Sequence, residues 1–183
     1  MKVFEIDKDD EGDLKKTQEE LIVKADEGDI LLLRKNLSNL NEDENKQREN
    51  MFHSRYTIQE KFCSLIIDEE SCAIIVSLGM VEKLNLHATS HPHPYHVHWV
   101  NQDKGLPVKS RSFISFTIGK HYQHQTWFDV ILMDACHAML GRPWLYDRKV
   151  MHNRHLNTYS LSKGGKTITL TPLNSTQLKN SKP

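Results

Sequence analysis

The chain has 183 residues, of which 38% are hydrophobic, and its formal net charge is zero. This length allows one domain with extensions or two small domains, and the low apolar fraction predicts a compact core in only part of the chain. Charge is unevenly placed: residues 1–30 carry 11 acidic and 5 basic residues, whereas residues 61–183 carry 8 acidic and 14 basic ones. A surplus of that size is too small to indicate nucleic-acid binding.

The sequence also bears on the compartment. No stretch approaches the roughly 18 apolar residues of a membrane helix, and the N-terminus has no apolar signal segment. The three cysteines, Cys63, Cys72 and Cys136, are odd in number and lack Cys-x-x-Cys spacing, which is typical of a reducing environment. We therefore expect an intracellular, cytoplasmic protein without membrane contact.

Residues 1–57 are expected to form an acidic, largely flexible linker. The range 36–50 is rich in polar and turn-forming residues, although the apolar run 30–33 is compatible with a strand. A folded domain is predicted over 58–173, followed by a flexible tail at 174–183.

Within 58–173, short apolar or alternating segments with β-branched residues predict strands. Helical turns are expected at 78–86, from apolar residues at three-residue steps, and at 143–148, which opens with a proline. Many short strands with glycine-containing turns indicate an all-β barrel or sandwich. The predicted strands are 57–58, 62–67, 73–77, 95–100, 108–118, 126–132, and a terminal hairpin of 158–161 and 167–170.

One carboxylate stands out. The apolar run Leu65-Ile66-Ile67 ends at Asp68, which places an acid at the end of a buried strand, and a polar loop follows. An aspartic peptidase needs two carboxylates that share one proton. Because only one such aspartate is present, a peptidase of this size must pair Asp68 with its copy across the two-fold axis of a homodimer. Taken alone, an aspartate after a strand is more often a turn residue.

Ordered motifs surround this aspartate: CSLIID at 63–68, SC at 71–72, VEKLNL at 81–86, HPHPY at 91–95, LGRPWLYDR at 140–148 and KTITLTPL at 166–173. Together they resemble the retropepsin-like domain of plant Ty3/Gypsy-type retrotransposon polyproteins over about 110 residues. The resemblance implies a closed β-barrel with one short helix in its second half, a homodimer, and hydrolysis of peptide bonds in a polyprotein.

The resemblance also assigns roles to residues. Asp68 matches the catalytic aspartate, Ser71 supports the active-site turn, and Gly141 belongs to a hydrophobic-hydrophobic-Gly element that packs beside that turn. A hairpin covering the substrate is implied at about 95–111, with its tip at Asp103, Lys104 and Gly105. The substrate is a peptide or polyprotein, and no metal or organic cofactor is implied.

Glu69 and Glu70 depart from the small residues that the family has at these positions. Glutamates strain a tight turn where φ is positive. They also bring like charge near the aspartate pair, which raises carboxylate pKa values and opposes protomer approach. We therefore expect impaired activity, and a non-catalytic binding or remnant module is the alternative.

The remaining reactive side chains have simpler interpretations. His96 and His98 share a strand face and could hold a metal, but prolines interrupt the segment and a polar surface is favoured. Cys136 and His137 are adjacent and so point to opposite faces. All three cysteines are expected in or near the core. Trp144 is expected to pack the short helix on the barrel rather than to stack nucleic-acid bases.

Overall fold

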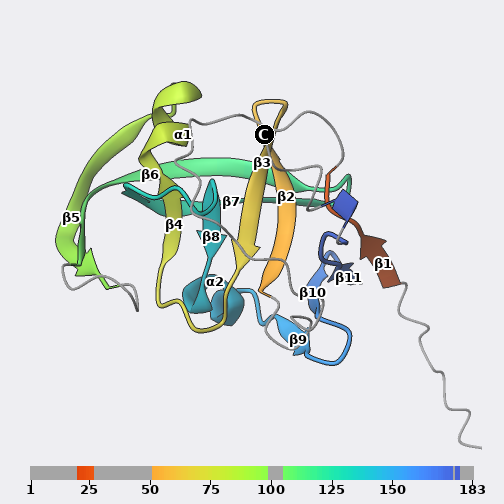
Figure 1. Cartoon of the computed structure of the whole chain (residues 1–183). Coiled ribbons are helices and arrows are strands. Elements are labelled where there is room, and N and C mark those ends of the chain that lie inside the picture. Colours follow the sequence, from red (N-terminus) through yellow and green to blue (C-terminus); the bar gives the residue numbers. More distant parts are fainter. Residues whose placement is uncertain (1–19, 27–50, 99–104, 175, 178–183) are drawn as a thin grey trace, which may run out of the picture.

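The computed structural model describes residues 20–26, 51–98, 105–174 and 176–177 (Figure 1). Its chain order is β1 (Glu20–Val23), β2 (Phe52–Ile58), β3 (Lys61–Ile67), β4 (Ile74–Ser77), α1 (Leu78–Lys83), β5 (Ala88–Val97), β6 (Leu106–Ile118), β7 (Tyr122–Ile131), β8 (Ala138–Leu140), α2 (Arg142–Asp147), β9 (Met151–Asn153), β10 (Thr158–Lys163) and β11 (Lys166–Leu170).

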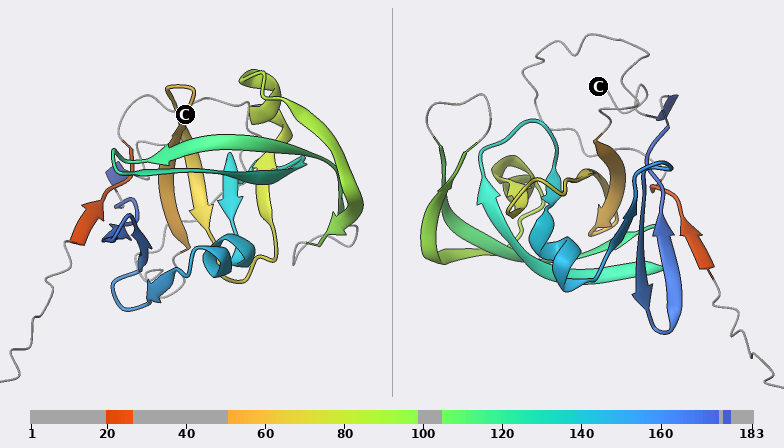
Figure 2. Two further views of the ribbon diagram at one scale, coloured as in Figure 1. Left: turned by 180° about the vertical axis from the view of Figure 1, so that it is seen from behind. Right: turned by 90° about the horizontal axis from the view of Figure 1, so that it is seen from below.

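The larger sheet closes on itself. Its strand order is β2-β3-β8-β4-β7-β6-β5, and β2 also pairs with β6, where Thr57 lies opposite Thr117. The six strands from β2 round to β6 therefore form a closed barrel, and β5 extends β6 as a curved arm (Figures 1 and 2). The predicted all-β barrel is confirmed, as are the terminal hairpin of β10 and β11 and the short helix in the second half.

A second sheet lies beside the barrel, with the order β1-β11-β10-β9. The backbone joins the two sheets, because the N–H of Leu173 donates to the carbonyl of His53 on β2 at 2.8 Å. β9, at the edge of this sheet, lies near α2 in Figure 1. The predicted helical turns at 78–86 correspond to α1, which the hydroxyl of Ser77 caps by accepting from the N–H of Met80 at 3.2 Å.

The barrel interior explains why several strands lack alternation. Leu65 and Ile67 of β3 pack into an aromatic-rich cluster with Phe116 and Phe128, whereas Ile66 points to a second cluster with Ile75. Because the end of β3 is buried on both faces, its sequence there is a continuous apolar run, Leu65-Ile66-Ile67, without alternating polar residues. Each such side chain contributes about 1.5–3 kcal/mol by burial. This packing fixes the end of β3, and with it the position of Asp68.

Two segments within the range 1–57, which is expected to be a largely flexible linker, are strands. β1 pairs in parallel with β11, from Glu20 opposite Thr167 to Val23 opposite Leu170. β2 begins at Phe52 and pairs along its whole length with β3. The sequence FHSRYTI does not predict this strand by a regular alternation of polar and apolar residues, because the polar residues Ser54 and Arg55 are buried together with the apolar ones. The predicted strand at 30–33 lies outside the described residues. Both helices in the described ranges have six residues, and neither is long or apolar enough to cross a membrane.

Candidate active site

Asp68 follows the last residue of β3 directly and is half-buried. β3 pairs in parallel with β8, with Ile67 opposite Leu140, and the N–H of Asp68 extends the pairing by donating to the carbonyl of Leu140 at 3.1 Å. The aspartate is therefore held by the segment that leads into Gly141. Two motifs that lie about 70 residues apart in sequence meet here, as an active site built from both of them requires.

Gly141 packs against the loop that follows Asp68. A Cβ atom at Gly141 would lie 2.6 Å from the carbonyl oxygen of Ser71 and 2.3 Å from that of Ala73. The next residue, Arg142, donates its N–H to the carbonyl of Ser71 at 2.8 Å. Because both neighbours are backbone atoms, only glycine fits at this point. The hydroxyl of Ser71 lies 3.4 Å from both the N–H and the carbonyl oxygen of Ala73, so its polar contacts stay within the loop.

The loop itself is a local turn closed by the aspartate. The N–H of Glu70 donates to Oδ1 of Asp68 at 2.9 Å, which is the pattern of an Asx turn. The described residues with positive φ outside glycine are Gln59, Glu60, Asn85, Lys149 and Asn157, and neither Glu69 nor Glu70 is among them. The strain that a positive φ would cause is therefore absent from this turn.

Glu69 makes long-range contacts. Its carboxylate accepts from Nη2 of Arg154 at 3.0 Å and lies 3.4 Å from Nδ1 of His152 on β9. The positive charge of Arg154 therefore offsets part of the negative charge that is expected beside Asp68. Glu70, in contrast, is exposed at the surface of the loop.

An aromatic pair adjoins these acids. His152 stacks on Tyr159 with ring centroids 4.2 Å apart and an interplanar angle of 9°, and Phe52 meets Tyr159 edge-to-face at 5.0 Å. Burial raises the pKa of Tyr159 to about 12, and the negative charges of Glu69 and Asp68 add to the rise. Tyr159 therefore stays protonated and neutral beside the two carboxylates.

The remaining predicted residues lie elsewhere. Asp103 and Lys104 fall outside the described residues, and Gly105 immediately precedes β6, which pairs with β5 in a hairpin. His96 and His98 are both exposed, and the described part of the chain has no group of three potential metal ligands. Trp144 is buried on α2 and meets Tyr122 edge-to-face at 6.2 Å, so the packing expected of it is confirmed.

The cysteine prediction is right for two residues and wrong for one. Cys63 and Cys136 are buried, whereas Cys72 is exposed because it lies in the loop after Asp68 and not in a strand. Three residues beside this loop, His152, Arg154 and Tyr159, were not predicted from the sequence. β9 and β10 pair as a local hairpin, but the contacts of His152 and Arg154 with Glu69 join residues 83 and 85 positions apart, which no local pattern signals.

Comparisons with known proteins give neighbours of one kind. No family model matches the sequence, and no curated protein matches it. Similar solved structures include the retroviral protease-like domain of Ddi1 from Leishmania major, at 14% identity and a TM-score of 0.49, covering 69% of this chain and 96% of that one. The EIAV protease complexed with the inhibitor HBY-793 is 13% identical with a TM-score of 0.39, covering 54% and 88%. A retropepsin-like aspartic protease from Rickettsia conorii is 16% identical with a TM-score of 0.38, covering 58% and 79%.

Proposed function

We propose that this chain is a retropepsin-like aspartic peptidase domain of retrotransposon origin, which hydrolyses peptide bonds through Asp68 carboxylates paired in a homodimer. The observation that carries the proposal is the packing of Gly141 against the backbone of Ser71 and Ala73, beside the hydrogen bond from Asp68 to Leu140. This arrangement fixes a carboxylate at a strand end by contacts from a distant, glycine-dependent segment. The order of the sequence motifs supports the retrotransposon origin.

The chemistry follows from two carboxylates in one site. When two Asp68 side chains face one another, they share one proton because both cannot ionise at short range. The ionised group takes a proton from water as general base, and the protonated group hydrogen-bonds the carbonyl oxygen of the scissile peptide. One protomer supplies one such aspartate, so this mechanism requires a second copy. A peptide substrate would lie under the hairpin of β5 and β6.

Glu69 and Glu70 should impair the peptidase activity to different extents. Glu69 is engaged by Arg154 and His152, whereas Glu70 is exposed beside Asp68. Because φ is not positive at Glu70, its charge is the expected cause of impairment, and not backbone strain. Replacing Glu70 with glutamine should therefore raise activity as much as replacing it with glycine.

The test is peptide cleavage by the full chain. A mixed peptide library is digested from about pH 4 to pH 7, where shared-proton carboxylates are active, and products are read by mass spectrometry. Cleavage should be lost in Asp68→Asn and raised in Glu70→Gln and Glu70→Gly alike. If glycine alone raises cleavage, the turn and not the charge limits activity. Sedimentation measured in parallel reports whether the homodimer forms.

A non-catalytic peptide-binding or remnant module is the second candidate. The observation that favours it is the exposed Glu70 next to Asp68, which adds an acid to each protomer where the pair must approach. Absence of cleavage by the parent and by both Glu70 variants, with folded protein confirmed by circular dichroism, would establish this alternative over the peptidase.

A further inference from the structure

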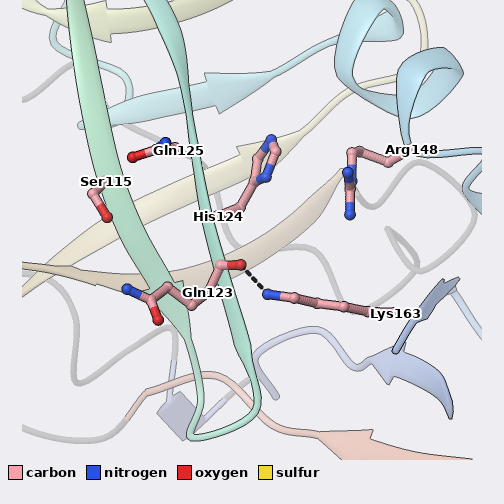
Figure 3. Close-up of a pocket in the computed structure, with 6 residues that line it drawn as sticks. All are labelled: Ser115, Gln123, His124, Gln125, Arg148 and Lys163. Atoms are coloured by element: carbon pink, nitrogen blue, oxygen red, sulfur yellow. Dashed lines mark hydrogen bonds between the residues drawn. The ribbon is translucent and has the colours of Figure 1, made fainter. Parts of the chain in front are cut away.

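A second polar site lies away from Asp68, beside the start of β7. It is a pocket of about 350 Å³ lined by Ser115, Gln123, His124, Gln125, Arg148 and Lys163. In Figure 3 the side chains of His124, Arg148 and Lys163 lie on the same side of β7, with Arg148 coming from the end of α2 and Lys163 from the second sheet. Three elements far apart in sequence thus contribute nitrogen donors to one hollow, and none of its lining residues is acidic.

The two permanent cations are incompletely satisfied. Nε of Arg148 is buried without a hydrogen-bond partner. Nζ of Lys163 donates to the carbonyl of Gln123 and lies 5.2 Å from the centre of the Tyr122 ring. An ammonium group has three donors, so the contact with Gln123 leaves others for a ligand. Within the described ranges, the ion pairs join other residues: His91 with Asp129, and Glu69 with His152 and Arg154.

The positive charges act on their neighbours. Burial lowers the pKa of His124, and the charges of Arg148 and Lys163 lower it further. Burial raises the pKa of Tyr122, and the charge of Arg148 partly offsets this rise. Among the described residues no acidic side chain forms an ion pair with Arg148 or Lys163, so their positive charge lies in a partly desolvated place, where a bound anion gains more than it would in water.

We propose that this pocket binds a phosphate group. The donors that face one another are a guanidinium fork, an ammonium group and an imidazole, whereas the side chains of the other lining residues, Ser115, Gln123 and Gln125, lie on the opposite side of β7 in Figure 3. Several donors from different directions suit a tetrahedral ion with many acceptor oxygens better than a planar carboxylate, and two fixed cations match a dianion. The volume exceeds that of the free ion, so a phosphomonoester of a small molecule is the favoured form.

The test titrates the full chain with inorganic phosphate, adenosine monophosphate and acetate at constant ionic strength, followed by calorimetry and by the NMR signals of the histidine rings. Phosphate should bind more tightly than acetate and raise the pKa of His124, whose facing charged and titratable groups are Arg148, Lys163 and Tyr122. Tighter binding of the monophosphate than of phosphate would identify an ester as the preferred source, and equal binding would identify the free ion. Lack of binding by both overturns the proposal, as does equal affinity for acetate.

Variants locate the site. Lys163→Ala should weaken phosphate binding at least tenfold, the loss expected for one charge-assisted hydrogen bond. Arg148→Lys keeps the charge but loses the fork, and should weaken binding several-fold. Lys166→Ala is the matched control, because Lys166 lies opposite Lys163 across the same hairpin turn but does not line the pocket. An equal loss in Lys166→Ala, or no loss in Lys163→Ala, would show general charge attraction and refute the assignment.

Discussion

Gly141 gives the sharpest test of how the aspartate loop is held. Its backbone has φ −94° and ψ −168°, which alanine adopts without strain. The cost of Gly141→Ala is therefore steric: the new Cβ would lie 2.3 Å and 2.6 Å from two carbonyl oxygens of the loop. Overpacking of this kind costs about 1–3 kcal/mol and sometimes more. The loop is pinned by the bond from Arg142 to Ser71, so we expect the upper end of that range.

A matched glycine separates steric cost from backbone strain. Gly164 has φ +58°, and a Cβ atom there would have no neighbour within 4 Å, so Gly164→Ala adds only the conformational cost of about 1–2 kcal/mol. Both substitutions restrict the unfolded chain alike, which stabilises each variant by about 0.4–1 kcal/mol. Urea unfolding should therefore show a net loss of about 2 kcal/mol or more for Gly141→Ala and of about 0–1.6 kcal/mol for Gly164→Ala. Equal losses, or a loss confined to Gly164→Ala, would refute the packing argument.

Three further predictions follow from burial and charge. Cys72 should react rapidly with a thiol reagent in the folded protein while Cys63, whose pKa burial raises to about 12, stays unreactive; Cys72→Ser should remove the fast phase. The lowered pKa of His124 means that the folded state binds a proton less readily than the unfolded chain, so its contribution to stability falls as pH drops below 6.5 and is constant above; His124→Gln should flatten this slope in urea unfolding. Arg154→Ala should reduce stability by less than about 1 kcal/mol, because the pair with Glu69 is exposed, and the difference should vanish at about 1 M salt.

The parts of the fold that local patterns encode were predictable. The run ending at Ile67, the hairpin around Gly164 and the helix after Gly141 each carry a signal within a few residues: an apolar stretch, a glycine turn and an early proline. The position of Asp68 at a strand end followed from the same patterns. Its association with Gly141 came from the order of motifs and not from periodicity.

The features that the sequence does not predict depend on contacts between residues that lie far apart in the chain. β1 is a strand because β11 supplies its hydrogen bonds, and Ile22 within it is largely exposed, so its four residues carry no amphipathic signal. The partner of Glu69 lies 85 residues away, and nothing in the sequence marks Arg154 as that partner. Cys72 lies in the loop between β3 and β4, so the burial of the neighbouring strand residues does not extend to it.

The pairing of β2 with both β3 and β6 decides which piece of this chain can exist alone. A closed barrel has no strand edges, and removal of one strand exposes two. A fragment that starts at Ile58 would leave β3 and β6 with unpaired backbone groups next to the apolar side chains that Phe52 and Tyr56 now cover. Such edges pair readily with other molecules, so the shortened domain would aggregate. A lack of peptide cleavage by this fragment would then reflect its insolubility and not an inactive catalytic site.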